Sequence, residues 1–170
     1  MESKNSTVRL VDVGIDNFDD LIDLMPFKSQ YSFVAENVYS LAEAYANLAD
    51  GRYAKPFGIY AGDEPVGSLM IGFDIADEEA DREKYPLLTD NYLIWRFMID
   101  KRYQGKGYGK QALGLALDFI RTWPRGKAEY CWLSYEPENE AARQLYRSFG
   151  FVEAAEMPEG WDEIPAALKL

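Results

Sequence analysis

A run of closely spaced glycines separates a segment with strand periodicity from a segment with helix periodicity. The run is Gln104-Gly105-Lys106-Gly107-Tyr108-Gly109; the strand-like stretch 92–99 precedes it, and a stretch with Leu113, Leu117 and Ile120 at helical spacing follows it. Glycines at such a junction let backbone N–H groups converge, and the positive end of the helix dipole favours an anion there. The loop therefore indicates either a bound phosphate-like anion or a tight strand-to-helix turn with nothing bound.

The details of the loop argue against a dinucleotide site of the Rossmann type. The glycines are spaced G-x-G-x-G rather than G-x-G-x-x-G. The loop also follows the third or a later strand, and no acidic ribose ligand is apparent on a following parallel strand. We therefore do not expect nicotinamide or flavin dinucleotide binding.

Alternating strand and helix patterns fill the rest of the chain. The turn sequence Gly62-Asp63-Glu64 joins two of the strands as a hairpin, and the acidic stretch 75–91 is expected to form a surface loop or short helix. Strands are expected at 8–13, 57–61, 65–73, 92–99, 128–135, 151–157 and 164–170, and helices at 16–25, 34–49, 107–122 and 139–149.

This order predicts an α/β (α+β) fold with a mixed sheet and helices on both faces. A chain of 170 residues fits one domain, so we expect residues 1–170 to form a single domain. In the helix expected at 34–49, an apolar stripe is expected to pack on the sheet; it comprises Val34, Val38, Leu41, Ala42, Tyr45 and Leu48.

Composition excludes several classes of function. The 18 Lys and Arg against 29 Asp and Glu give a formal charge of -11, which opposes nucleic-acid binding. There is no histidine, and the one cysteine, Cys131, is expected to be a buried structural thiol, so the usual zinc ligands and the commonest general base are missing. The polar N-terminus and the absence of an apolar run near 18 residues indicate a cytoplasmic protein that does not enter the membrane.

Two sequence blocks resemble the GCN5-related N-acetyltransferase (GNAT) superfamily. The glycine loop matches the family's acetyl-CoA signature of Gln or Arg, two residues, Gly, one residue, then Gly or Ala. The family's Asn-x-x-Ala, Leu-Tyr and Gly-Phe pattern appears downstream as Asn139, Ala142, Leu145-Tyr146 and Gly150-Phe151. The resemblance extends over nearly the whole chain, and the stretch 95–103 is similar to the spermine/spermidine acetyltransferase branch.

The resemblance implies a mostly antiparallel sheet whose central strands splay apart around acetyl-CoA, with no metal. Asn139 is then both a helix N-cap and a cofactor contact. The N–H near Met98 would bind the thioester carbonyl. The cofactor-binding positions that it implies are Phe97, Met98, Ile99, Gln104, Gly105, Lys106, Gly107, Tyr108, Gly109, Lys110 and Asn139.

Tyr146 is the candidate general acid within the resemblance. It lies seven residues, or two helical turns, after Asn139, so both share one helix face. A phenol with a reference pKa of about 10 can protonate the departing coenzyme A thiolate after direct attack by an amine. Taken alone, a helical tyrosine is also a common core residue.

The acceptor amine and the general base are less constrained. The strand 92–99 carries no carboxylate, which leaves Glu36 and Glu136 as candidates for the base, each of which is also explained as a solvated surface residue. A polyamine groove would need aromatic and acidic side chains, for which the candidates are Tyr31, Phe33, Glu36, Phe73, Asp74 and Glu136.

A small-molecule polyamine such as spermidine or spermine is the expected acceptor. The alternatives are an aminoglycoside, an amino acid or a protein amine, or a non-catalytic acetyl-CoA sensor; the charge of -11 opposes a nucleic-acid partner. A homodimer is a further possibility.

Overall fold

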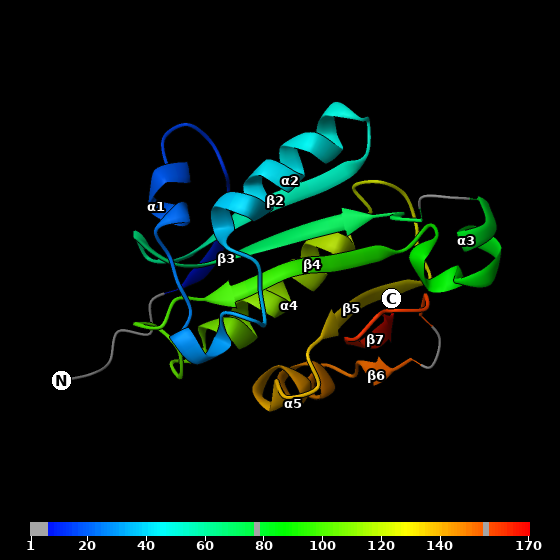
Figure 1. The fold of residues 1–170 in the computed structure, drawn as a ribbon. Coiled ribbons are helices and arrows are strands. Elements are labelled where there is room, and N and C mark those ends of the chain that lie inside the picture. The colour runs from blue at the N-terminus through cyan, green and yellow to red at the C-terminus, as the bar shows by residue number, and fades with distance from the viewer. Residues whose placement is uncertain (1–6, 77–78, 155–156) are drawn as a thin grey trace.

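The computed structural model describes residues 7–76, 79–154 and 157–170, and its elements follow the expected order (Figure 1). The strands are β1 (Val8–Asp12), β2 (Tyr53–Ala61), β3 (Glu64–Phe73), β4 (Tyr92–Ile99), β5 (Tyr130–Tyr135), β6 (Val152–Glu153) and β7 (Ile164–Lys169). The α-helices are α1 (Phe18–Ile22), α2 (Asn37–Ala49), α3 (Glu79–Lys84), α4 (Tyr108–Ile120) and α5 (Glu140–Ser148), with short 3-10 turns at Lys28–Gln30 and Pro86–Leu88.

The seven strands of the described residues form one sheet in the order β1-β2-β3-β4-β5-β7-β6. Every neighbouring pair is antiparallel except β4 and β5, which run parallel. The hairpin between β2 and β3 turns at Gly62, whose φ of 64° suits glycine. The predicted mixed and mostly antiparallel sheet is therefore confirmed.

A β-bulge in β4 changes which side chains face which side of the sheet. The register against β3 shifts after the pair Met70–Arg96, so that Ile71 faces Ile94 and Trp95 is the extra residue. Side chains normally alternate along a strand, and an extra residue inverts the alternation beyond it. Ile94 and Phe97 consequently pack into the same hydrophobic cluster although they are three residues apart.

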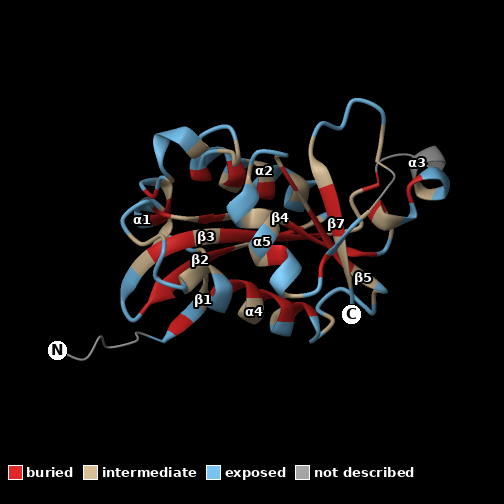
Figure 2. Ribbon diagram, turned by 90° about the horizontal axis from the view of Figure 1, so that it is seen from below, coloured by how far each residue is buried: buried red, intermediate tan, exposed pale blue. Residues whose placement is uncertain are grey.

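Helices cover both faces of the sheet (Figure 2). On one face, α4 and α5 contribute Leu113, Leu117 and Tyr146 to the main hydrophobic cluster. On the other face, Leu21 of α1 and Ala44 of α2 pack on separate, smaller clusters of sheet residues. Cys131 is fully buried in the main cluster, and burial raises the pKa of its thiol, as expected for a structural cysteine.

The predicted apolar stripe of the second helix is wrong. The chain is not helical at 34–36, so α2 begins at Asn37, and its buried face carries Asn37, Ser40 and Ala44. Asn37 is satisfied there, because its Nδ2 donates to the Leu21 carbonyl at 2.7 Å and its Oδ1 accepts from the Ser68 hydroxyl at 2.7 Å. The outward face instead carries apolar residues, including Val38, Tyr45 and Leu48 at 52%, 76% and 54% exposure.

Two other segments bear on the sequence predictions. The acidic stretch 75–91 contains the short helix α3, one of the two predicted alternatives, and also a 3-10 turn; residues 77–78 in it lie outside the described part. The strand expected at 151–157 is reduced to the two residues of β6; residues 155–156 again lie outside the described part.

Asp100, directly after β4, fastens the glycine loop to the segment between α1 and α2. Its side chain is 2% exposed; Oδ2 accepts from the Met25 N–H at 3.0 Å, and Oδ1 accepts from the N–H and Nε of Arg102 at 2.9 and 2.8 Å. Burial alone would raise the pKa of Asp100, but the hydrogen bonds from Arg102 and Met25 outweigh it and lower the pKa.

We predict that Asp100→Asn destabilises the protein by about 1–3 kcal/mol at neutral pH. Both carboxylate oxygens of Asp100 accept hydrogen bonds from N–H groups, and the asparagine side chain would place an NH₂ donor where one of these acceptors stood. A carboxyl whose folded pKa is lowered stabilises above its unfolded pKa of about 3.9, and the effect is lost as pH falls through the folded value. Urea unfolding at several pH values measures the difference, which should narrow below about pH 4.

The matched control is Asp118→Asn on α4, whose side chain is 76% exposed and 3.7 Å from Arg121. This change should alter stability by less than about 0.5 kcal/mol. Equal stability of the two variants at neutral pH would contradict the role assigned to Asp100.

Candidate functional site

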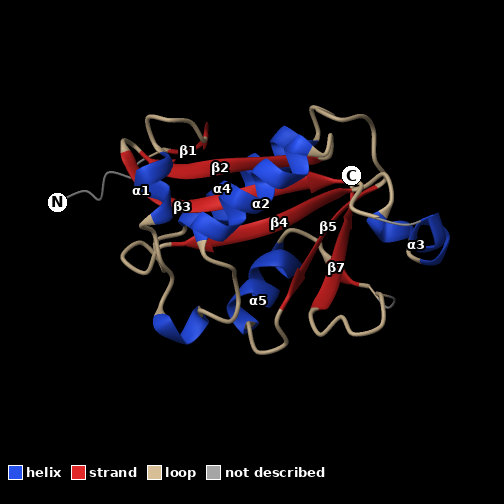
Figure 3. Cartoon of the chain, turned by 45° about the horizontal axis from the view of Figure 1, so that its top comes forward, coloured by secondary structure: helices blue, strands red, loops and turns tan. Residues whose placement is uncertain are grey.

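The central feature of the site is the separation of β4 from β5. In the described part of the chain these strands pair only at Tyr92–Cys131 and Leu93–Trp132, and beyond these pairs they diverge (Figure 3). β4 continues on β3 as far as Ile99, whereas β5 continues on β7 as far as Tyr135. The strands are held apart by their outer partners, which confirms the predicted splay.

Two cavities meet at this opening. The glycine-loop cavity, of about 430 Å³, is lined by the loop, the end of β4 and the start of α5. The tryptophan cavity, of about 540 Å³, is lined by Trp95, Trp132 and Trp161 together with the segments 31–35 and 160–163. Phe33, Val34, Phe97, Asn139 and Tyr146 line both cavities.

The glycine loop has the geometry of an anion site. Gly105 and Gly107 have φ values of 75° and 80°, and Gly107 is the left-handed N-cap of α4 without a side-chain cap. Among the described residues, the backbone N–H groups from Gly105 to Lys110 find no hydrogen-bond partner. Free amides at a helix N-terminus attract an anion, and the exposed Lys106 and Lys110 add positive charge to the loop.

Gln104, the first residue of the glycine motif, holds the loop in place. Its Nε2 donates to the Ile99 carbonyl at 2.9 Å and to Gln30 Oε1 at 2.8 Å, and Gln30 Nε2 donates back to Gln104 Oε1 at 3.2 Å. The glycine loop is therefore tied to the segment before α2, which lines both cavities.

The pairing of β4 with β3 decides which backbone groups face the opening. The Asp100 N–H donates to the Val66 carbonyl at 2.9 Å, so the backbone groups of Asp100 point toward β3. Along an antiparallel strand, the backbone groups of successive residues point alternately toward one neighbouring strand and toward the opposite side. The N–H and carbonyl of Met98 therefore point to β3, in agreement with the close approach of the Met98 oxygen to Gly67. Those of Phe97 and Ile99 point into the opening.

Tyr146 and Asn139 lie at the junction of the two cavities. Asn139 caps α5, with its Oδ1 accepting from the Ala142 N–H at 3.2 Å, as predicted. Tyr146 is 8% exposed, and among the described residues its hydroxyl forms no hydrogen bond. Burial, followed by the charge of Glu163 and the proximity of Tyr135, raises the pKa of Tyr146, so its phenol stays protonated at neutral pH.

The tryptophan cavity is both aromatic and acidic. Trp161 packs against Trp132 with ring centroids 6.3 Å apart and ring planes tilted by 54°, and Asp162 and Glu163 follow it in the same wall. Glu163 accepts a hydrogen bond from the Ser134 hydroxyl. The sequence gives no local signal for this wall, because only the pairing of β5 with β7 brings 160–163 beside the opening.

The acidic residues expected from sequence lie elsewhere. Asp74 pairs with Arg82 at 2.7 Å, and Glu36 is an exposed residue at the N-terminus of α2. Glu136 is half-buried near the tryptophan cavity; burial, and then the charges of Glu163, Glu138 and Asp162, raise its pKa. Of the described side chains that line either cavity, none belongs to Glu36, Asp74 or Glu136.

The expected aromatic residues divide between the cavity and the core. Tyr31 and Phe33 line the tryptophan cavity. Phe73 instead packs edge-to-face on Tyr92 in the main cluster, with centroids 4.9 Å apart.

Comparison with known families decides what this arrangement is. The family model described as the acetyltransferase (GNAT) family matches residues 19–151. The chain belongs to this family. It is therefore an acetyl-CoA-dependent N-acetyltransferase, and the matched range contains the glycine loop, the diverging strands and α5.

Proteins that this chain resembles in sequence or in fold carry names that specify different acceptors. A spermine/spermidine N(1)-acetyltransferase of Bacillus subtilis (strain 168) is 32% identical over 148 residues, covering 85% of this chain and 88% of that protein. RimL, a ribosomal L7/L12 alpha-N-protein acetyltransferase, has a similar structure with a TM-score of 0.69 at 17% identity, covering 97% of this chain and 91% of that one.

A second solved structure contains the cofactor. The PaiA N-acetyltransferase of Thermoplasma acidophilum, in complex with coenzyme A, matches with a TM-score of 0.67 at 16% identity and covers 96% of this chain and 99% of that one. These low identities support the fold alone.

Among the described residues, no helix has the length and apolar character needed to cross a membrane. The described carboxylates near the tryptophan cavity do not form a group that could hold a metal ion.

Proposed function

We propose that the enzyme transfers the acetyl group of acetyl-CoA to a primary amine of a polyamine such as spermidine or spermine. The observation that carries this proposal is the meeting of the two cavities at Tyr146, one with free backbone amides and the other with aromatic and acidic walls. The amides suit the cofactor phosphates, and the second cavity suits a cation.

The glycine-loop cavity fits coenzyme A by its donor set. The free N–H groups from Gly105 to Lys110, with Gln104 bracing the loop and Lys106 and Lys110 nearby, would hold the pyrophosphate. Bound acetyl-CoA supplies an activated acetyl group as a thioester. The pantetheine arm would run along the free edge of β4, where the N–H groups of Phe97 and Ile99 face the opening.

The backbone of β4 and the side chain of Tyr146 would act at different steps of the reaction. An N–H of Phe97 or Ile99 would stabilise negative charge on the carbonyl oxygen during direct attack by the amine. Tyr146, kept protonated by burial, would then donate its proton to the departing thiolate. Asn139 shapes the same junction by starting the helix that carries Tyr146.

Support for a polyamine comes from the walls of the tryptophan cavity. Asp162 and Glu163 offer negative charge, and the Trp132–Trp161 pair offers aromatic faces for an ammonium group and its methylene chain. Arg96 also lines this cavity, but its guanidinium is paired with Glu43 at 2.8 Å. The relative from Bacillus subtilis named for spermine and spermidine is consistent with this assignment.

We predict that spermidine or spermine is acetylated with a kcat/KM at least about tenfold higher than lysine, an aminoglycoside or a peptide α-amine, a difference within the usual reach of pocket contacts. Release of free coenzyme A thiol measures turnover across this panel. Preference for the peptide amine would support a protein acceptor, while acetyl-CoA binding without transfer to any amine would support a sensor.

We predict that Tyr146→Phe lowers kcat by about 10²–10³-fold, because the departing thiolate loses its proton donor while packing is retained. Affinity for acetyl-CoA, measured by calorimetry, should stay within about twofold of wild type. Tyr130→Phe on β5, outside both cavities, is the control and should retain full turnover. An unchanged kcat in the Tyr146 variant would contradict the assignment of Tyr146 as the general acid.

We predict that Gly107→Ala weakens acetyl-CoA binding by at least about tenfold, since a side chain at its φ of 80° strains the loop by about 1–2 kcal/mol and displaces the amides. Gly62→Ala is the matched control, because its φ is 64° and it lies in the exposed β2–β3 turn. Both variants should lose similar stability, and calorimetry should find weaker cofactor binding in the Gly107 variant alone. Equal affinity for acetyl-CoA in both variants would contradict the placement of the coenzyme A pyrophosphate at the glycine loop.

A further inference from the structure

We propose that Glu163 receives the ammonium group of the acceptor and takes its proton, which supplies the general base that β4 lacks. This inference rests on the proposed acetyl transfer to an amine. It assigns the role to a residue outside both of the sequence blocks that carry the family resemblance.

The position of Glu163 follows from the sheet. It lies directly before β7, whose register places Ile164 beside Tyr135 and Pro165 beside Ser134 at the end of β5. The Ser134 hydroxyl donates to one oxygen of the Glu163 carboxylate, which fixes the side chain and leaves the other oxygen free for a ligand. The residue is half-buried in the wall of the tryptophan cavity.

Glu163 is also close enough to the proposed acid to interact with it. Its charge is among the causes of the raised pKa of Tyr146, and both side chains line the same cavity. An amine held between them would have a proton acceptor on one side and a proton donor on the other. Such an arrangement is what an amine-to-thioester transfer requires at neutral pH.

The charges around Glu163 favour a cation at this point. Asp162 and Glu136 add negative charge, while Arg96 has its charge neutralised by Glu43. The titratable or charged groups that line the tryptophan cavity with Glu163, or interact with it through their charge, are Tyr31, Arg96, Tyr135, Glu136, Tyr146 and Asp162.

The proton balance of the step is complete. Glu163 takes one proton from the acceptor ammonium, and the neutral nitrogen forms a bond to the thioester carbonyl carbon. When the carbon–sulfur bond breaks, Tyr146 gives its proton to the thiolate and regains one from the acetylated nitrogen. Glu163 then releases its proton to water, so the products are the amide, free coenzyme A and one proton.

The test is Glu163→Gln, an isosteric change that keeps an oxygen to accept from Ser134. With spermidine and saturating acetyl-CoA, kcat/KM should fall by about 10²-fold near pH 7, within the usual range for a lost base. The deficit should then shrink by about tenfold per pH unit as pH rises, because the fraction of neutral amine grows toward an ammonium pKa of about 10.4.

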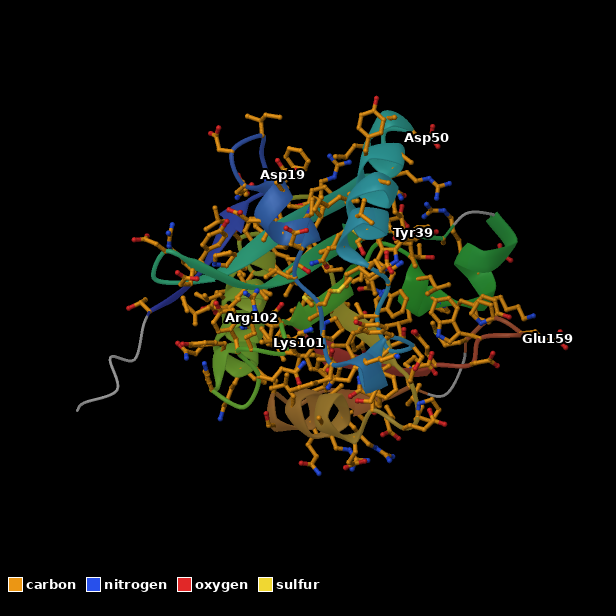
Figure 4. All side chains as sticks on the ribbon, turned by 60° about the vertical axis from the view of Figure 1, so that its left-hand side comes forward. Asp19, Tyr39, Asp50, Lys101, Arg102 and Glu159 are labelled. Carbon is orange, nitrogen blue, oxygen red and sulfur yellow. The ribbon has the colours of Figure 1, made fainter. Side chains whose placement is uncertain are left out.

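The control is Glu159→Gln, which removes the same charge from the same loop. Glu159 is exposed at the outer edge of the molecule (Figure 4) and is absent from the described lining of the tryptophan cavity. This variant should keep the wild-type pH profile. Glu163→Asp retains a carboxylate, so it should be slower than wild type but lack the steep rise with pH that the Gln variant shows.

The inference is overturned if Glu163→Gln keeps the wild-type kcat/KM, or if its deficit is the same at every pH, as expected for lost contact alone. It is also overturned if the Asp variant shows the same steep rise as the Gln variant. A wild-type enzyme that acetylates no amine would contradict the proposed function instead. Unchanged affinity for acetyl-CoA in all variants, measured by calorimetry, verifies that each is folded.

Discussion

The site depends on the short parallel pairing between β4 and β5. Two residue pairs join these strands, after which each strand follows a different neighbour, β3 on one side and β7 on the other. Backbone N–H and C=O groups at the edge of a strand have no partner within the sheet. An opening inside a sheet therefore leaves these groups available to a ligand. Both cavities form at this opening, and the two elements that carry the proposed chemistry, the end of β4 and α5, line it.

The surrounding structure keeps this opening in shape. The bulge at Trp95 inverts the alternation of β4, so Phe97 packs toward α4 while Trp95 and Arg96 line the tryptophan cavity. Asp100 and Gln104 then fasten the end of β4 to the segment around Met25 and Gln30. Since that segment continues into residues that line both cavities, the glycine loop and part of the wall of the tryptophan cavity are held by the same set of hydrogen bonds.

Much of the fold follows from local patterns in the sequence. Strand alternation, helical spacing and the glycine turn gave most elements to within a few residues, because those patterns act over short stretches of chain. The stripe on α2 was wrong for a reason that no local pattern reveals. Asn37 is buried there because Leu21 and Ser68, distant in sequence, satisfy its amide, so the polar face turns inward and the apolar face outward.

The family, the glycine loop and the candidate acid could all be predicted from the sequence, because the glycine loop and the Asn139–Tyr146 spacing are each contained in one short segment. The backbone groups of β4 that face the opening, and the carboxylate whose charge acts on Tyr146, follow from the tertiary structure alone. The first depends on the register with β3, and the second on the pairing of β5 with β7, which brings Glu163 next to Ser134 across 29 positions of chain. Such long-range pairing is fixed by packing and hydrogen bonds between strands, which the local sequence does not specify.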